Sequence, residues 1–421
     1  MSLVDLLPAW LGRQRWYSGP APSSVVLTAD EELAPGLRWL LVEADGACYQ
    51  VVVGSRPGGE PPEFLAGRDH EILGEVDGWL AFDALADPDL ARAILEWVVP
   101  GEEVTVVRPV GAEQSNTSLV FDDRLILKVF RRLHRGPNPD IEVTTALARS
   151  GFEQVAEPLG VWRRDGTDLA VCTPYLSGGA EGWALALTSL RDLYAMACDD
   201  PAECGGDFAA EACRLGEVTA AMHLALADAF AAGVGDPSRW ADGIETQLAG
   251  CAGDAEAAGP LLARVRGVGS AGLSIRGHGD YHLGQVLRTD GGWFVLDFEG
   301  EPARPVDQRW LGSSPLKDVA GMLRSFDYAA RFALRERDEA ERESHSRRAD
   351  AWEARNRVAF LAGYEGTGGI DALLPPAGPD RATVLAAFEL DKALYEVAYE
   401  QAHRPDWADI PAAAVRRLLG G

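Results

Sequence analysis

The sequence predicts an α+β fold with three successive parts: one rich in β-strands, a small mixed one, and a large helical one. Stretches of β-branched and apolar residues, separated by Gly/Pro turns, lie mostly within about the first 175 residues. Beyond about residue 180 the chain becomes rich in Ala and Leu, which favours helices. With 421 residues, 47% of them hydrophobic, the chain can form two or three domains. We expect their boundaries at 1–100, 101–177 and 178–421.

The first part, residues 1–100, is expected to form a β-containing subdomain. Its opening contains Trp10 and Trp16 and precedes the first strand signals. The expected strands, bounded by Gly/Pro turns, lie at 23–29, 37–43 and 47–54. Residues 83–97 have the pattern of a short helix that ends before Pro100. No motif typical of catalysis occurs in this part.

The second part, residues 101–177, combines strands with one helix. The expected strands, rich in β-branched residues, lie at 104–110, 117–121, 124–130, 157–162 and 168–173. Asp122 and Asp123 are expected to form a tight turn. Asn138 as cap, Pro139 in the first turn and Gly151 as the stop predict a helix over 138–151.

The third part, residues 178–421, is expected to be mainly helical, with one strand-like stretch at 292–298. The helix after Asp318 has a regular apolar face made of Val319, Met322, Leu323, Phe326 and Ala330. A second helix is expected around 383–402. We expect Asp318 to cap its helix and brace the loop before it, rather than to bind a substrate.

The charge balance excludes several kinds of partner. Lys and Arg number 39 and Asp and Glu 65, giving a net charge of −26. So acidic a chain repels polyphosphate and anionic lipid, which disfavours nucleic acid and a membrane surface as partners. The apolar, aromatic-rich composition also disfavours disorder.

The N-terminus and the cysteines predict a cytoplasmic protein. Asp5 and Pro8 interrupt the first apolar stretch, which has no basic residues before it, so it does not resemble a signal peptide. No apolar run reaches the roughly 18 residues that a bilayer span needs. The six cysteines contain no C-x-x-C pair, which argues against zinc and a disulfide framework. A monomer is favoured, although the oligomeric state stays open.

The strongest motif is Gly277-His-Gly-Asp-Tyr-His-Leu-Gly-Gln285, followed by Asp297 after a short strand. Phosphoryl transfer from ATP needs a carboxylate that orients the acceptor hydroxyl and takes its proton. It also needs oxygen ligands that hold Mg²⁺ against the phosphates. We therefore expect Asp280 to be the base, with Gln285 and Asp297 as Mg²⁺ ligands. Such residues in a loop often only cap helices, but their combined spacing favours catalysis.

Two upstream residues fit the same chemistry. Lys128 lies in an apolar strand, and Glu142 follows it early in the next helix, where the two could pair while the amine binds the ATP phosphates. Taken singly, they would be a solvent-facing lysine and a glutamate that interacts with the helix dipole. The chain has no G-x-x-x-x-G-K-[ST] sequence, which excludes a P-loop ATPase.

Other nucleotide contacts are expected from two loops. The loop before the Lys128 strand would cover the phosphates, and the hinge at 173–179 would contact the nucleotide. The expected nucleotide-binding residues in these loops are Ser115, Asn116, Thr117, Ser118, Pro174, Tyr175 and Leu176. The order of loop, lysine, glutamate, hinge, base and metal ligands is that of a kinase-like bilobal enzyme.

These motifs resemble the actinobacterial maltokinase-like branch of the aminoglycoside-phosphotransferase superfamily. The resembling segments lie at 10–16, 113–118, 127–131, 136–140, 277–285, 296–302, 314–328, 390–396 and 404–407. The resemblance implies a bilobal protein-kinase-like fold with an N-terminal cap subdomain, a Mg²⁺-ATP site in the cleft and a sugar as acceptor. It supports the roles given above to Lys128, Glu142, Asp280, Gln285 and Asp297.

The acceptor is less well defined than the reaction. Members of this branch make maltose 1-phosphate, and a related group phosphorylates glucosamine at its 6-position. Tyr281 stands where maltokinases usually carry Leu, and 16–20 also departs from their pattern. We therefore expect glucosamine, with maltose as the alternative. An aminoglycoside kinase is disfavoured by the segments at 314–328 and 390–407, and a pseudokinase by the presence of Asp280, Gln285 and Asp297.

An amino sugar needs a carboxylate for its ammonium and a small polar pocket. The expected substrate residues are His282, Glu299, Arg304, Asp391, Tyr395, Tyr399, Asp406 and Trp407. Asp391, Tyr395 and Tyr399 would share one helix face. Trp407 could stack on a sugar or pack in the core, and both alternatives stay open.

Overall fold

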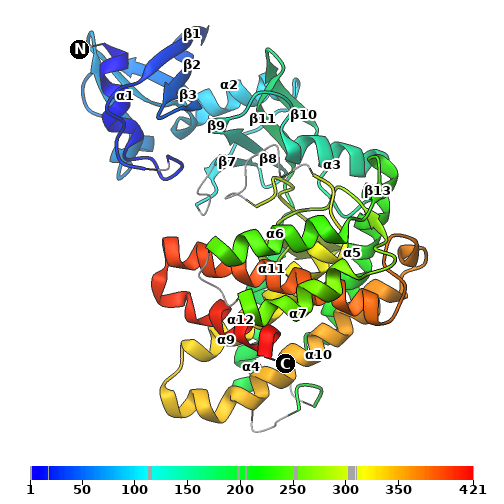
Figure 1. The fold of residues 1–421 in the computed structure, drawn as a ribbon. Helices are drawn as coiled ribbons and strands as arrows, with labels where there is room; N and C mark the ends of the chain where they lie inside the picture. Colours follow the sequence, from blue (N-terminus) through cyan, green and yellow to red (C-terminus); the bar gives the residue numbers. More distant parts are fainter. Residues whose placement is uncertain are drawn as a thin grey trace. The chain divides into compact units, whose positions relative to one another are not determined.

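The structure of the protein is a computed structural model that describes residues 2–17, 19–111, 116–196, 200–203, 206–250, 255–301, 309 and 311–420. The chain divides into two compact units. One comprises Met1–Thr145 and Ala156–Ser177, and the other Ala146–Val155 and Gly178–Gly421. The first unit contains two antiparallel sheets and the second is mainly helical (Figure 1), which confirms the α+β class.

The N-terminal sheet is antiparallel, with strand order β1-β2-β3-β5-β4, and β9 pairs with β3. Its strands are β1 (Val26–Ala34), β2 (Leu37–Ala44), β3 (Ala47–Pro57), β4 (Ile72–Val76), β5 (Trp79–Asp83) and β9 (Arg132–Leu133). Strands β2 and β3 match two of the predicted ones, and β1 overlaps the expected strand at 23–29 but begins later and runs on to Ala34. Asp45 and Gly46, with φ of 49° and 76°, form the tight turn between β2 and β3. Strands β4 and β5 are additional to the prediction.

Two helices complete this part of the first unit. Helix α1 (Leu3–Leu11), which the sequence did not predict because Asp5 and Pro8 interrupt its apolar pattern, packs against β4. The rings of Trp10 and Trp16 meet edge to face at 5.6 Å between centroids, so the N-terminal tryptophans are core residues. Helix α2 (Pro88–Val98) begins at its cap Asp87, whose carboxylate accepts from the Asp89 amide at 2.9 Å.

The second sheet of this unit has strand order β10-β11-β8-β7-β6. The strands are β6 (Val107–Pro109), β7 (Asn116–Phe121), β8 (Leu125–Phe130), β10 (Gly160–Arg164) and β11 (Thr167–Pro174). Asp122 and Asp123 have positive φ and form the predicted turn between β7 and β8. Helix α3 (Pro139–Arg149) follows, and the Asn138 side chain accepts from the Asp140 amide at 2.8 Å.

Buried polar contacts join the two sheets. Nη2 of Arg131 lies 2.5 Å from Oδ2 of Asp83, its Nε donates to Oγ1 of Thr117 at 2.8 Å, and its guanidinium stacks over Trp16. The Gln50 side chain donates to the carbonyl oxygens of Phe130 and Leu169, both at 2.5 Å.

The apolar residues of the two sheets also share a core. Leu37 and Val52 of the N-terminal sheet belong to the same buried cluster as Leu127 and Val129 of β8. The two sheets are therefore packed as one body.

The second unit is built mainly from long helices. They are α4 (Gly182–Ala195), α5 (Ala209–Ala229), α6 (Pro237–Gly250), α7 (Ala255–Arg266), α9 (Leu316–Arg335), α10 (Glu339–Gly366), α11 (Pro379–His403) and α12 (Asp409–Gly420). The predicted apolar face of α9 is buried throughout. Gly216 allows helices α5 and α10 to approach closely, since a Cβ at this position would lie only 2.1 Å from the Phe360 carbonyl oxygen.

Short strands and 3₁₀ turns complete the second unit. The strands are β12 (Ala180–Glu181), β13 (Gly233–Val234), β14 (Leu273–Ser274), β15 (Val286–Thr289) and β16 (Gly292–Val295). β12 pairs with β15, and β15 with β16. The 3₁₀ turn η4 (Leu283–Gln285) leads into β15. Within the described ranges, no helix combines the length and apolar character needed to cross a membrane.

Candidate active site

The backbone of the loop at 277–285 is held in place by Asp318, in the first turn of α9. Its Oδ2 accepts from the His278 amide at 2.7 Å and its Oδ1 from the Gly279 amide at 2.9 Å. Gly277 leaves room for this carboxylate, because a Cβ there would lie 2.6 Å from Oδ2. Pro315, not Asp318, is the N-cap of α9. Asp318 therefore braces the loop as expected, from a position inside the helix.

Asp318 is itself held by a chain of buried hydrogen bonds. Nε2 of His223 is 3.1 Å from its Oδ2, and Nδ1 of the same ring is 2.8 Å from the Tyr364 hydroxyl. Burial acts to raise the pKa of Asp318, but the hydrogen bond from His223 and the loop amides outweigh it and lower the pKa to about 2. The brace is therefore an ionised carboxylate with fixed hydrogen-bond partners.

Asp280, on this loop, forms an ion pair that the sequence analysis missed. Nζ of Lys392, on α11, lies 2.7 Å from Oδ1 of Asp280 and 3.2 Å from Oε1 of Glu301. Nε2 of His282 lies 3.8 Å from the other Asp280 oxygen. Burial opposes ionisation of Asp280, yet Lys392 and His282 hold its pKa well below the usual range. Asp280 is thus kept deprotonated and oriented.

Tyr281 points away from this centre. Its side chain is buried, and its hydroxyl lies 2.9 Å from Oγ1 of Thr219 on α5. Tyr281 is therefore a core residue. The tyrosine that departs from the maltokinase pattern contributes to the core next to the loop.

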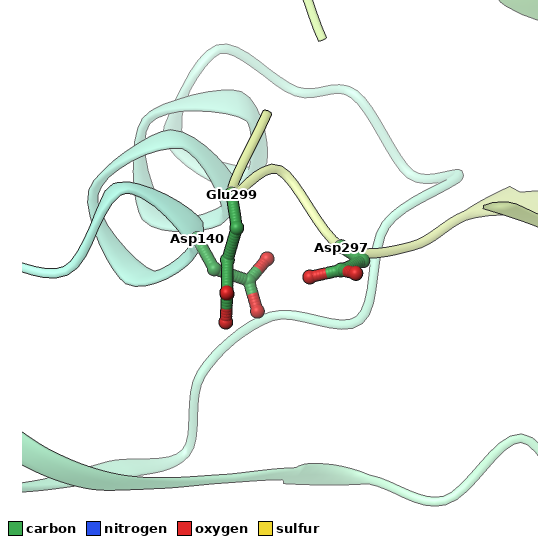
Figure 2. Close-up of side chains that lie close together, drawn as sticks. All are labelled: Asp140, Asp297 and Glu299. Carbon is green, nitrogen blue, oxygen red and sulfur yellow. The ribbon is translucent and has the colours of Figure 1, made fainter. Parts of the chain in front are cut away.

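The two predicted metal ligands lie side by side in the second unit. Nε2 of Gln285 is 3.3 Å from Oδ2 of Asp297, and the Leu296 amide donates to the Gln285 carbonyl at 2.9 Å. Asp297 has a positive φ of 62° and lies two residues after the end of β16. Glu299 lies two residues further along the same segment (Figure 2). Carboxylate and amide oxygens are ligands suited to Mg²⁺.

In the first unit, Lys128 of β8 contacts a carboxylate that the sequence analysis did not single out. Its Nζ lies 3.3 Å from Oδ2 of Asp140, in the first turn of α3. Glu142, the predicted partner, lies in the same turn. Both acidic residues are therefore positioned on the helix that follows Lys128.

The remaining predicted nucleotide residues lie in or beside the second sheet. Asn116, Thr117 and Ser118 begin β7, and Thr117 accepts the hydrogen bond from Arg131. Pro174 ends β11, and the guanidinium of Arg108 lies over the Tyr175 ring at 5.1 Å. Leu176 is partly buried. Ser115 and Arg304 lie outside the described residues.

A cavity of about 420 Å³ opens beside Asp280 and Lys392, and we call it the α9–α11 pocket. It is lined by Glu181, Trp183, Asp280, His282, Gly284, Gly321, Ser325, Tyr328, Phe332, Lys392, Tyr395, Glu396, Tyr399, Glu400 and Arg404. Aromatic rings and carboxylates thus surround the candidate base. The volume is in the range of small-molecule sites.

Three of the predicted substrate residues line this pocket, namely His282, Tyr395 and Tyr399. Four others are not among the lining residues: Glu299, Asp391, Asp406 and Trp407. Asp391 accepts a hydrogen bond from Gln247 of α6. The ring of Trp407 stacks on Phe332 at 5.0 Å, behind the pocket wall, so the structure favours its packing role over direct stacking on a sugar.

Comparisons with known proteins relate this chain to sugar kinases. Residues 10–87 match the family model for the maltokinase N-terminal cap domain. Glucosamine kinase from Mycolicibacterium smegmatis is 31% identical over 329 residues, which cover 74% of this chain and 79% of that protein. Glucosamine kinase from Streptacidiphilus jiangxiensis is 29% identical over 362 residues, covering 79% and 78%.

A solved structure of glucosamine kinase in complex with glucosamine, ADP and inorganic phosphate is also similar to this chain. It superposes with a TM-score of 0.66 at 25% identity, covering 100% of this chain and 99% of that one. The likeness extends over both units and includes the parts of the chain that hold the loop at 277–285 and the α9–α11 pocket.

Proposed function

Because this chain belongs to the glucosamine kinase family, we propose that it transfers the γ-phosphoryl group of Mg²⁺-ATP to glucosamine. Membership makes it a phosphotransferase with an alcohol group as acceptor. The products would be glucosamine 6-phosphate and ADP. The observation that carries the proposal is the position of Asp280, held in an ion pair on the wall of the α9–α11 pocket.

Asp280 would act as the base in this pocket. A sugar hydroxyl that donates a hydrogen bond to its carboxylate is oriented toward the γ-phosphorus. As the new oxygen–phosphorus bond forms, the bond to the β–γ bridging oxygen breaks and ADP leaves. The hydroxyl proton passes to Asp280. Lys392 supports this role because it fixes the orientation of the carboxylate and keeps it ionised.

Gln285 and Asp297 would hold Mg²⁺. Their oxygen-bearing side chains are adjacent, and the backbone hydrogen bond between Leu296 and Gln285 fixes the segment that carries them. When bound, the ion would neutralise charge on the nucleotide phosphates. The donor set therefore fits a hard divalent cation.

Lys128 would bind the nucleotide phosphates as a point charge. The carboxylate of Asp140 limits the conformations of its amine, and Glu142 adds a second acidic group to the same helical turn. Asn116, Thr117 and Ser118 would add amide and hydroxyl donors, with Ser115 beside them in the sequence. The hinge residues Pro174, Tyr175 and Leu176 would contact the base of the nucleotide.

The pocket lining supports an amino sugar as acceptor. The rings of Tyr395 and Tyr399 stack along α11 and offer apolar faces to a sugar ring. The carboxylates of the lining favour a cationic ligand over a neutral one. His282 lies beside Asp280, where it can contact the same hydroxyl.

Maltose is the second candidate acceptor, favoured by the match of residues 10–87 to the maltokinase cap domain. A coupled ADP-release assay with glucosamine, glucose, maltose and kanamycin distinguishes the candidates. We expect turnover to be fastest with glucosamine. Turnover of maltose alone would overturn the proposal in favour of a maltokinase, and turnover of kanamycin alone would favour an aminoglycoside kinase.

A further inference from the structure

Four carboxylates line the α9–α11 pocket, and two of them form ion pairs with Lys392 and Arg324. Asp280 is paired with Lys392 at 2.7 Å. Oε2 of Glu396 lies 2.6 Å from Nη2 of Arg324, whose side chain is 4% exposed. Because both carboxylates already have a cationic partner, an incoming cation would compete with an existing ion pair at either of them.

Glu400, the third carboxylate, is also occupied. It accepts two hydrogen bonds from Arg404, at 2.7 and 2.9 Å, and a third from the Tyr328 hydroxyl at 2.9 Å. Its side chain is 4% exposed. Three of the four lining carboxylates thus each have a cationic partner, and two of these cations, Lys392 and Arg324, also pair with a carboxylate outside the lining.

Glu181 is the fourth carboxylate of the lining. Among the residues that the structure describes, no cationic group pairs with it and no hydrogen-bond donor reaches its carboxylate. It is the N-cap residue of α4, yet its side chain makes no capping hydrogen bond. Glu181 remains accessible to solvent, and the part of its side chain that is buried raises its pKa. A bound cation would lower it again.

The position of Glu181 places its carboxylate beside the catalytic loop. Strand β12 pairs Glu181 with Leu287 of β15, directly after that loop. A Cβ at Gly284 would lie 3.3 Å from Oε1 of Glu181 and 2.9 Å from the ring of His282. Position 284 therefore touches both side chains, and its lack of a side chain keeps this part of the pocket open.

We propose that Glu181 is the residue that recognises the ammonium group of the acceptor, by accepting a charge-assisted hydrogen bond from it. This inference rests on the proposed glucosamine kinase function and deepens it. The ammonium group of an amino sugar would give Glu181 a cationic partner, whereas a neutral sugar leaves it unpaired. Glu181 is thus a specificity-determining residue. Glu396 and Glu400, which are held in ion pairs, form part of the pocket wall.

The test compares Glu181→Gln with the wild type and with Glu217→Gln, an exposed position on α5 where the same charge is removed. Steady-state kinetics are measured with glucosamine, with glucose as acceptor or competitive inhibitor, and with ATP varied. We expect the KM for glucosamine to rise at least about tenfold in Glu181→Gln, with kcat reduced less than about threefold. The KM for ATP and the affinity for glucose should change less than about twofold.

Two further results complete the test. Glu181→Asp keeps the charge and should retain part of the preference for glucosamine over glucose, whereas Glu217→Gln should behave as the wild type. An unchanged KM for glucosamine in Glu181→Gln overturns the inference, and so does an equal loss with glucose, which would indicate a general role in pocket shape. If the wild type itself does not phosphorylate glucosamine, the proposed function fails and the inference fails with it.

Discussion

Lys392→Met tests whether the buried lysine controls the candidate base. The substitution keeps a long apolar side chain but removes the charge that lies 2.7 Å from Asp280 and 3.2 Å from Glu301. The side chains of these two carboxylates are only 16% and 1% exposed, so both would be left buried without their partner. Breaking a buried pair in this way costs about 3–5 kcal/mol of unfolding free energy.

The same substitution should change the pH dependence of catalysis. In the wild type, Lys392 and His282 hold the pKa of Asp280 below its usual range, so the base stays ionised even in moderately acidic solution. Without Lys392, burial raises the pKa, and Asp280 becomes protonated as the pH falls through a higher value. We expect the acidic limb of kcat/KM to move upward by at least about one pH unit.

The assays are urea unfolding at neutral pH and coupled ADP release between pH 4.5 and 8.5. Arg191→Met is the matched control, because Arg191 is 69% exposed and its ion pair with Asp192 is long, at 3.5 Å. It should cost less than about 1 kcal/mol and leave the pH profile unchanged. A Lys392→Met protein with wild-type stability and the wild-type acidic limb would refute the role assigned to this lysine.

Three further predictions concern single carboxyl groups. Asp280→Ala should abolish phosphoryl transfer while ADP binding, followed by calorimetry, changes less than about threefold; a substantially active variant would remove Asp280 from the role of base. Asp318→Asn should lower kcat at least about tenfold and stability by about 2–3 kcal/mol, since the amides of His278 and Gly279 lose an ionised acceptor; rates and urea unfolding equal to the wild type would contradict the brace. Burial and the nearby Asp83 raise the pKa of Glu71 to about 7, so the fold retains a proton that the unfolded chain releases near pH 4.5, and stability should decrease as the pH rises between these values. Glu71→Gln should therefore raise the melting temperature more at pH 8 than at pH 5, and an equal change at both would argue against the shift.

The sequence predicted the strands that are marked by a continuous apolar segment between turn residues. Strands β2, β3, β8 and β11 are apolar segments ended by turn residues, and their bounds are close to the expected ones. Strand β4 was missed because Gly74, with a φ of 147°, lies at an irregularity in its pairing with β5 and obscures the alternation. In β4, therefore, the irregular pairing hides the pattern by which the sequence would reveal the strand.

Sequence patterns singled out part of the candidate site, including residues of the motif at 277–297 and the pocket residues Tyr395 and Tyr399. Asp280, Gln285 and Asp297 could be singled out because their spacing along the chain carries the chemistry. Lys392 could not, because its role depends on contacts with residues 112 and 91 positions away. Its one signal was a lysine between acidic residues on an otherwise well-packed helix, a pattern that equally suits a solvated surface.

The coordinates also add a partner that the sequence did not indicate. Asp140 and Glu142 lie in the same helical turn; the sequence pointed to Glu142, and the structure adds Asp140, 3.3 Å from Lys128. Trp407 illustrates the same limit, since a tryptophan after a proline suits both a sugar platform and a packed core. Its stacking on Phe332 was decided by the path of the chain after α11.

The contacts of Arg131 and Gln50 limit how the N-terminal sheet can be removed or exchanged between related proteins. A chain shortened to begin near residue 100 would retain the Arg131 guanidinium and the carbonyls of Phe130 and Leu169, but would lose Asp83 and Gln50, which satisfy them. The N-terminal sheet is therefore not a detachable module. A chimera that exchanges this sheet between related kinases would have to transfer the partners on both sides of the junction together, so the two sheets are expected to diversify as a single inherited unit.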